Sequence, residues 1–263
     1  MGSVVVVVLW VVLALAAPVV APYPPLQQDI ANRLSDPSQT HWLGTDVLGR
    51  DILSRILHGA RISIPVGIAA VILAAVLGTI VGSIAGFIGG LLDEVVMRVT
   101  DLMLSFPTVI LALVITAALG AGIQTAIIAI MIAWWPSYAR LVRGLVISVK
   151  EREYVVAARA LGASQLRALL RHVLPNTVSP IIIMSTLDMG YAILTFASLS
   201  FLGLGPPPEV PEWGSMIAAG RNNFDQWWIS TFPGLAILSL TLAFNIVGDS
   251  LRDLLDPRFR KGT

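Results

Sequence analysis

The stretch Glu153-Tyr-Val-Val-Ala-Ala-Arg-Ala-Leu-Gly162, followed by His172-Val-Leu-Pro175-Asn176, interrupts an otherwise apolar chain. Seven basic residues lie in and around it: Arg140, Arg143, Lys150, Arg152, Arg159, Arg167 and Arg171. Apolar stretches flank this 140–176 segment on both sides. Because positive charge concentrates in loops that stay on the cytoplasmic side of a bilayer, we predict that it is a cytoplasmic docking segment of a membrane protein. Its position then fixes the orientation of the remaining chain.

The overall composition independently indicates a membrane protein. Hydrophobic residues make up 56% of the 263 residues, charged residues make up 13%, and the mean hydropathy is +0.82. An ordinary soluble domain is about 45–50% apolar and about 25% charged. The chain has no cysteine, which excludes a disulfide framework and a thiolate metal site.

Six segments are apolar and long enough to cross a bilayer, since a spanning helix needs about 20 residues. They cover 4–21, 62–88, 102–119, 125–142, 178–202 and 231–247. The third and fourth are joined only by Gly120-Ala-Gly-Ile-Gln124, which predicts a tight antiparallel hairpin. The predicted fold class is therefore all-α, a polytopic membrane protein with six transmembrane helices and a cytoplasmic helix between the fourth and fifth spans.

The distribution of basic residues sets the orientation of this bundle. With the 140–176 segment inside, twelve of the 17 basic residues lie on the inner side and five on the outer side, as the positive-inside rule requires. An even number of spans then places both termini in the cytoplasm. The predicted organisation is a first transmembrane helix (1–22), an extracytoplasmic loop (23–61), a core of five transmembrane helices (62–257) and a cytoplasmic tail (258–263).

The first span has a competing interpretation. No basic residue precedes it, and Ala14-Leu-Ala16 could belong to a signal-peptide cleavage region. A signal peptide normally begins with a positively charged region, which this one lacks. A retained transmembrane helix is therefore the favoured interpretation.

The first outer loop is predicted to contain a helix that lies along the membrane surface. Thr45 is suited to cap it, and Asp51 and Arg55 have the i,i+4 spacing of an ion pair on its polar face. The apolar positions that define its other face are Leu48, Ile52, Leu53, Ile56 and Leu57. An interfacial helix is favoured over a contact with a soluble binding protein.

Several motifs in order resemble one family of membrane proteins. Ala157-Ala158-x-x-x-Gly162, followed by His172-x-Leu174-Pro175, resembles the EAA motif of permease subunits in binding-protein-dependent ABC importers. Four flanking stretches look like the second, C-type permease of the dipeptide, oligopeptide and nickel importers: Gly44-Thr-Asp-Val-Leu-Gly-Arg-Asp51, Leu199-Ser-Phe-Leu-Gly-Leu-Gly205, Glu212-Trp-Gly214 and Gly248-Asp-Ser-Leu-Arg-Asp-Leu-Leu-Asp-Pro257. The resemblance spans 43–257. One departure is Val156, which stands where the motif usually has glutamate.

The resemblance implies that 153–162 forms a coupling helix, seated in a groove of an ATPase subunit. The residues that it assigns to ATPase coupling are Glu153, Ala157, Ala158, Arg159, Gly162, His172, Leu174 and Pro175. From the residues themselves, small side chains allow close approach of another backbone, and a glycine allows a sharp turn with positive φ. Ser164 is suited to cap a following helix, and Pro175 is predicted to end it. The alternative is a basic loop that only orients the protein and binds anionic lipid.

The implied partners are a homologous second permease, two ATP-binding subunits, an extracytoplasmic substrate-binding protein and membrane lipid. The chain has no Gly-x-x-x-x-Gly-Lys-Ser/Thr loop, so no catalytic residue, cofactor or metal is expected in it, and ATP and Mg would be bound by the partners. No basic nucleic-acid-binding fold is indicated.

The function implied is import of di- or oligopeptides into a prokaryotic cytoplasm, across the plasma (inner) membrane, by alternating access. The alternatives are a nickel or other small-solute importer of the same family and an ion-coupled secondary transporter. The last would need ionisable residues in several spans, and the sequence supplies little beyond one.

That residue is Asp188, the ionisable residue deepest in a predicted span. A carboxylate within a membrane segment is a functional-site hypothesis by default, so it could lie on the substrate path and meet a peptide amino group. The structural alternative is a hydrogen bond across the interface to the partner permease, with Ser185, Thr186 and Gly190 allowing close packing. Both interpretations stay open.

Overall fold

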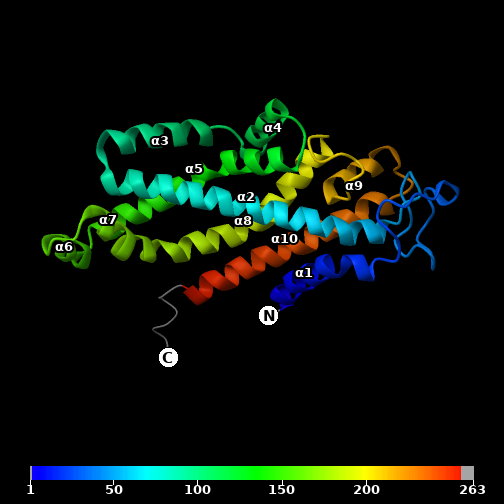
Figure 1. Cartoon of the computed structure of the whole chain (residues 1–263), viewed down its shortest axis with the longest axis horizontal. Helices are drawn as coiled ribbons and strands as arrows, with labels where there is room; N and C mark the ends of the chain where they lie inside the picture. The colour runs from blue at the N-terminus through cyan, green and yellow to red at the C-terminus, as the bar shows by residue number, and fades with distance from the viewer. Residues whose placement is uncertain (1, 256–263) are drawn as a thin grey trace.

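The computed structural model describes residues 2–255, and within them the fold is all-helical, with no strand (Figure 1). The all-α prediction is confirmed. The longer helices are α1 (Gly2–Val20), α2 (Ile52–Ile88), α3 (Gly90–Leu104), α4 (Thr108–Leu119), α5 (Ile123–Lys150), α8 (Val178–Phe201) and α10 (Trp228–Leu255). The shorter elements are η1 (Ile30–Asn32), α6 (Glu153–Ala160), α7 (Gln165–Ala168), η2 (Leu169–Val173), η3 (Leu174–Thr177), α9 (Trp213–Ala219) and η4 (Gly220–Asn222). The predicted tail, 258–263, lies outside the described residues.

Five stretches of helix in this part of the chain are long and apolar enough to cross a membrane: α1, α2, α5, α8 with the turns before it, and α10. The α3–α4 pair makes a sixth only if it is taken as one span. The two helices meet at an angle of 91°, so the span predicted over 102–119 is not one continuous helix. The break falls at Pro107, which has no backbone N–H and whose ring opposes a continuing helix. The count of six spans stays a prediction.

The separate interfacial helix predicted before the second span is also wrong. A single helix of 37 residues, α2, runs from Ile52 to Ile88. No residue between 57 and the predicted start of the span at 62 breaks the helix, so the helical segment 52–57 continues into the span. Pro65 is accommodated within the same helix. The outer loop is therefore shorter than predicted.

The start of α2 is also built differently from the prediction. Asp51, and not Thr45, caps the helix, because its carboxylate accepts a hydrogen bond of 2.8 Å from the backbone N–H of Ser54. Thr45 is buried in the loop, where its hydroxyl donates to the carbonyl of Asn32. The predicted Asp51–Arg55 pair does not form, since Asp51 contacts His41.

The two helices α2 and α5 pack closely through a run of glycines. Gly78, Gly82 and Gly86 follow one another at a spacing of four residues on α2. A Cβ atom on Gly82 would overlap the backbone carbonyl of Ala139 on α5, and its two neighbours meet the same helix. Small residues at this spacing let the backbones of membrane helices approach each other. The spacing of four residues is visible in the sequence, but the predictions from sequence did not include this helix contact.

Replacing Gly82 with alanine is expected to destabilise the bundle by about 1–3 kcal/mol, because the added methyl group would force two rigid backbones apart. The apparent melting temperature in detergent measures the effect. Gly234→Ala on α10 is the matched control, since a Cβ there meets nothing within 4 Å. Equal melting temperatures for the two variants would contradict the close α2–α5 contact.

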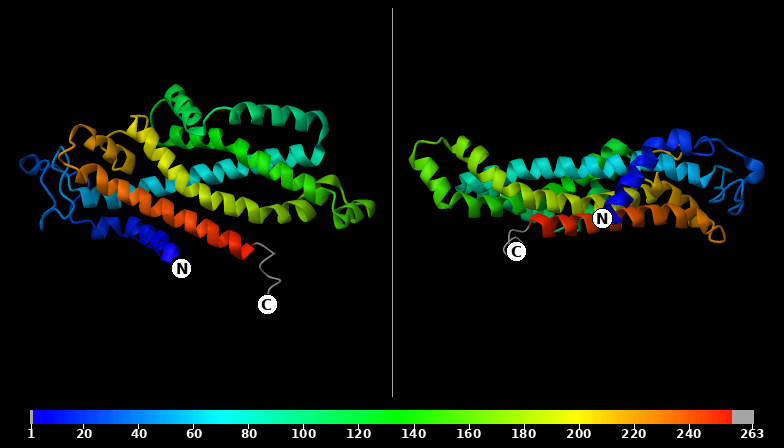
Figure 2. Two further views of the ribbon diagram at one scale, coloured as in Figure 1. Left: turned by 180° about the vertical axis from the view of Figure 1, so that it is seen from behind. Right: turned by 90° about the horizontal axis from the view of Figure 1, so that it is seen from below.

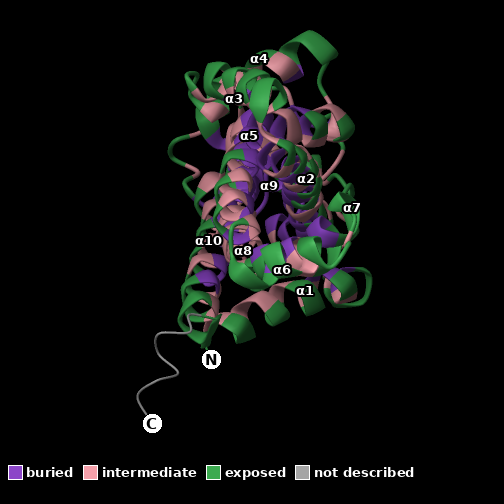
Figure 3. Ribbon diagram, turned by 90° about the vertical axis from the view of Figure 1, so that its left-hand side faces the viewer, coloured by how far each residue is buried: buried purple, intermediate pink, exposed green. Residues whose placement is uncertain are grey.

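The buried residues follow the centre of the bundle, where α2, α5 and α8 meet, and the outer faces of α1, α3 and α4 are largely exposed (Figure 3). One apolar cluster joins α1, α2, α8, α9 and α10, and a second joins α2, α4, α5 and α8. α2 and α8 contribute to both clusters. Exposed apolar faces of this extent are those expected of a protein surrounded by lipid or by other membrane subunits.

α9 is fastened to the start of α2 at the end of the bundle that carries the 21–51 loop (Figure 1). The fully buried Glu212 caps α9 by accepting hydrogen bonds from the N–H groups of Gly214 and Ser215, at 2.8 and 2.9 Å. Burial raises the pKa of the Glu212 carboxyl, and these N–H donors oppose the shift. The buried indole of Trp213 donates to the carbonyl of Ile56 at 3.0 Å. α9 is therefore an integral part of the fold and not a loose loop.

Candidate functional site

The opposite end of the bundle is a projecting tip made of α6 and α7 (Figures 1 and 2). α6 covers most of the predicted coupling helix. The chain then turns at Gly162, which has φ +92°, a conformation that side chains with a Cβ rarely adopt. Ser164 caps α7 by accepting a hydrogen bond of 3.3 Å from the N–H of Arg167. The predicted turn and cap are both confirmed.

One face of the tip is anchored to the membrane helices. Val155 of α6 is fully buried, and it packs with Leu169 and Val173 against the C-terminal half of α5. The residues of α5 in this cluster are Val142, Val146 and Val149. A movement of α6 would therefore be carried to α5, and through the continuous turns of 169–177 to α8.

The tip also exposes several large apolar side chains. Tyr154, Val156, Leu161, Leu166 and Leu170 are exposed, with Leu161 reaching 89% exposure. A polar surface would be expected on a solvent-facing tip with no partner. Exposed apolar side chains on a segment rich in arginine indicate a protein contact surface.

The residues predicted for coupling differ in how far they are exposed. Glu153, Ala157, Arg159, Gly162 and Pro175 are exposed, whereas Ala158, His172 and Leu174 are half-buried. Neither Glu153 nor Arg159 forms an ion pair with another residue in 2–255. The exposed side chains of α6 are therefore available to a group outside the chain. Leu174 belongs instead to the anchoring cluster.

Pro175 does not end the helical run, and this prediction is wrong. The chain passes from α7 through a π-helical turn, 169–173, into a 3-10 turn, 174–177, and then directly into α8. Pro175 occupies an early position of the 3-10 turn, where its missing N–H has no helical partner to lose. The tip is thus joined to α8 without a flexible break.

Asp188 lies on α8 and is paired within the chain. The hydroxyl of Tyr138, a fully buried residue of α5, donates to its Oδ2 atom at 2.7 Å. This bond joins two helices that are each long and apolar enough to cross a membrane. Tyr138 was not predicted as the partner of Asp188, because a tyrosine among apolar residues has no distinguishing sequence signal until the facing helix is known.

Replacing Tyr138 with phenylalanine is expected to destabilise the protein by about 1 kcal/mol, the usual strength of a hydrogen bond between membrane helices. The ring would keep its packing, and Asp188 would lose its donor. Thermal unfolding in detergent measures the change. Tyr191→Phe on α8 is the control because this side chain is 55% exposed. A loss of stability in the control as large as that of the test variant would contradict the assignment.

Residues 2–255 contain no group of three or more His, Asp or Glu side chains that could hold a metal ion. The imidazole of His41, in the 21–51 loop, contacts one carboxylate of the described residues, that of Asp51. The fold and the tip together define a bundle of helices of membrane-spanning length with a contact surface at one end.

Two solved structures have a similar fold. The inward-facing MetNI methionine ABC transporter in its CY5 selenomethionine-soak crystal form matches with a TM-score of 0.65. The match covers 78% of this chain and 98% of that chain, at 16% sequence identity. The native crystal form matches with a TM-score of 0.59 over the same shares. At this identity the likeness establishes the fold.

The chain belongs to the family of binding-protein-dependent transport system inner membrane components, whose model matches residues 78–261. It is 43% identical over 252 residues to the dipeptide transport system permease protein DppC of Alkalihalophilus pseudofirmus, covering 95% of this chain and 83% of that protein. It is 47% identical over 256 residues to the glutathione transport system permease protein GsiD of Shigella flexneri, covering 97% and 84%. The chain is a C-type permease of an ABC importer.

Proposed function

We propose that this chain is one of two permease subunits through which an ATP-driven importer moves di- or oligopeptides into the cytoplasm. The peptide class is supported by the relatives, which include a di/tripeptide permease of Pseudomonas aeruginosa that is 43% identical over 267 residues. One observation supports the proposed coupling of ATP hydrolysis to transport. The tip is anchored to the bundle through buried Val155 and also exposes apolar side chains to a partner. A receiving groove on an ATP-binding subunit would cover those side chains.

The proposed mechanism follows from how the tip is attached. When the two ATP-binding subunits close, they displace α6. The Val155 anchor transmits the displacement to α5, and the unbroken turns before α8 transmit it to that helix. The α5–α8 and α2–α5 contacts keep these helices together, so the bundle rocks between inward- and outward-facing states. ATP hydrolysis and Mg binding belong to the partner subunits.

The orientation proposed is that the tip and both termini are cytoplasmic, in the plasma membrane of a prokaryote. The distribution of basic residues supports it. The N-terminal end of α1 and the C-terminal end of α10 lie away from the 21–51 loop, toward the side of the tip (Figure 2). The outer loops and α9 would then face the substrate-binding protein, and the exposed apolar helix faces would meet lipid and the second permease.

Asp188 is proposed to contribute to the substrate path as well as to the α5–α8 contact. Its Oδ2 atom accepts from Tyr138, whereas no hydrogen bond to its Oδ1 atom is formed within residues 2–255. A peptide amino group reaching that oxygen would gain a charged partner in a medium of low dielectric constant. The carboxylate would thus hold the helices together and also meet the substrate.

The proposal is tested by reconstituting the chain with its co-purified subunits in proteoliposomes and measuring uptake of radiolabelled Ala-Ala. Uptake should require ATP and the binding protein and should be blocked by vanadate. An uncoupler should have no effect, and excess Ni²⁺ should not compete. Uptake abolished by the uncoupler alone would indicate an ion-coupled transporter, and transport of Ni²⁺ without peptide transport would replace the substrate class.

A further inference from the structure

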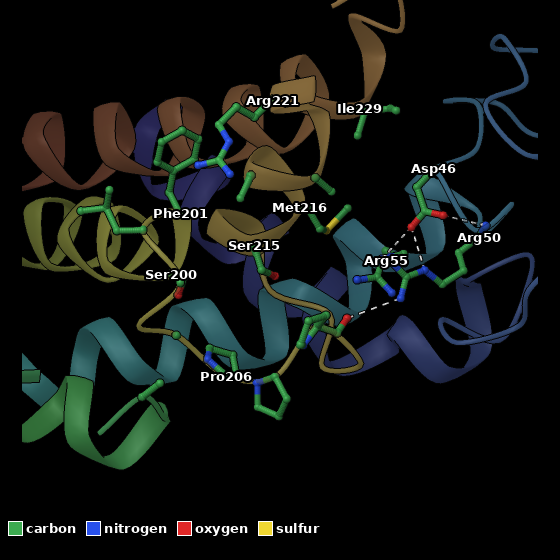
Figure 4. A pocket seen from close by; sticks show the side chains of 18 of the residues that line it. Asp46, Arg50, Arg55, Ser200, Phe201, Pro206, Ser215, Met216, Arg221 and Ile229 are labelled. Atoms are coloured by element: carbon green, nitrogen blue, oxygen red, sulfur yellow. Dashed lines mark hydrogen bonds and ion pairs between the residues drawn. The ribbon is translucent and has the colours of Figure 1, made fainter. Parts of the chain in front are cut away.

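A cavity of about 650 Å³ lies at the outer end of the bundle, between the start of α2, the loop that follows α8, and α9 (Figure 4). Its volume is typical of sites for small molecules, which are roughly 300–1,000 Å³. Much of the lining is apolar, including Ile52, Phe201, Met216 and Pro206. The polar lining is dominated by the guanidinium groups of Arg50, Arg55 and Arg221.

The charges of this cavity are not balanced. Arg50 donates from Nε to Oδ2 of Asp46 at 2.7 Å, and Nε of Arg55 lies 3.8 Å from the same oxygen. The two arginine side chains are only 8% and 3% exposed. Two buried positive charges therefore share one carboxylate. A buried charge needs a paired charge of opposite sign, so the cluster is short of one anion.

The hydrogen-bond donors of the cluster are also incompletely used. A guanidinium carries five N–H donors. Arg55 donates to the carbonyl of Pro25 at 3.3 Å, and Arg50 donates to that of Pro208 at 3.4 Å, which are long contacts with uncharged acceptors. The hydroxyl of Ser200, which lines the same cavity, forms no hydrogen bond of good geometry within residues 2–255, although it lies close enough to the Glu212 carboxylate to lower its pKa.

We infer that this cavity binds the carboxylate of a small solute, and that the solute is a short peptide held by its C-terminal carboxylate. The identity of the solute rests on the proposed function, whereas the preference for a carboxylate rests on the cavity alone. The planar fork of arginine matches a carboxylate in a bidentate manner. The apolar lining then receives peptide side chains.

The position of the three arginines favours a small solute over an acidic surface of a docking protein. Arg50 and Arg55 are buried at one end of the cavity, and Arg221 lies at the other end, beside Phe201 (Figure 4). A protein surface could reach the exposed Arg221 but not the buried pair. A ligand that enters the cavity can reach both.

The inference is tested by measuring binding affinities for the full chain in lipid nanodiscs. The ligands are Ala-Ala, its C-terminal amide and inorganic phosphate. Ala-Ala should bind, the amide should bind at least tenfold more weakly because it lacks the charge, and phosphate should not displace Ala-Ala. Two variants each remove one guanidinium of the cavity and should weaken Ala-Ala binding by about tenfold or more. They are Arg221→Gln, at an exposed side chain, and Arg55→Met, in which methionine replaces the apolar stem of the buried arginine. Arg33→Gln, an exposed arginine outside the cavity, should bind as the unchanged chain does.

Equal binding of the dipeptide and its amide, or unchanged binding by Arg221→Gln, would overturn the inference. Tighter binding of phosphate than of Ala-Ala would also overturn it. So would an Arg221→Gln variant that associates more weakly with the binding protein but binds Ala-Ala as the unchanged chain does. ATP-driven uptake reports on the proposed function separately. If Ala-Ala is imported and both cavity variants import and bind it normally, this inference fails and the proposed function stands.

Discussion

Replacing Gly162 with valine is expected to reduce ATP-driven uptake at least tenfold while the chain still inserts into the membrane. Gly162 has φ +92°, and a Cβ at this position meets nothing within 4 Å. The effect therefore comes from the backbone, because a β-branched residue in this conformation is strained by about 1–3 kcal/mol. The turn would open, and α6 would no longer be held at its angle to α7.

Gly144→Val is the matched control for this experiment. Gly144 lies in α5, and a Cβ there also meets nothing within 4 Å, but its φ is not positive. The control should transport normally. Bulky replacements at Ala157 and Ala158 should reproduce the loss seen with Gly162→Val, since they would obstruct the partner. Normal uptake by Gly162→Val would refute the assignment of the tip as the coupling element.

Replacing Trp213 with alanine is expected to destabilise the protein by about 3–5 kcal/mol, the usual effect of removing a large buried aromatic side chain. Trp213 is fully buried, its ring lies edge-on against Trp10, and its indole N–H donates to the carbonyl of Ile56. The change would leave a cavity where α1, α2 and α9 meet, and it would leave a buried carbonyl without a donor. The melting temperature in detergent should fall by about 10 °C.

Trp42→Ala serves as the control because Trp42 is 67% exposed in the outer loop. Its melting temperature should change little. Since α9 also borders the outer cavity, Ala-Ala binding by Trp213→Ala should weaken as stability falls. A melting temperature equal to that of the control would show that α9 is not fastened to α2 in the way described.

The sequence predicted the local features of the tip because each depends on one or two neighbouring residues. The positive φ at Gly162 and the cap at Ser164 are properties of those residue types. The helical fold also follows from composition. The span predicted over 102–119 contains Pro107, a local signal for a break, but the apolar run continues on both sides of it, and composition alone does not give the angle of 91° between the two helices.

Features that depend on a facing helix could not be predicted in the same way. The Tyr138 partner of Asp188 comes from a residue 50 positions away. The sharing of Asp46 by Arg50 and Arg55 depends on how the outer loop folds over the start of α2. The Gly78, Gly82 and Gly86 run is the exception, since its spacing alone indicates a close helix contact.

Site-specific crosslinking tests the central claim most directly, because the chain has no cysteine of its own. Ala157→Cys, on the exposed face of α6, would carry the only thiol in the chain, and Ser38→Cys would place one in the outer loop. In membranes that contain the assembled importer, mass spectrometry should identify a subunit with an ATP-binding loop crosslinked to Ala157→Cys and absent from Ser38→Cys. If Ala157→Cys captures no such subunit, or if Ser38→Cys captures it, the coupling surface and the orientation of the bundle are wrong.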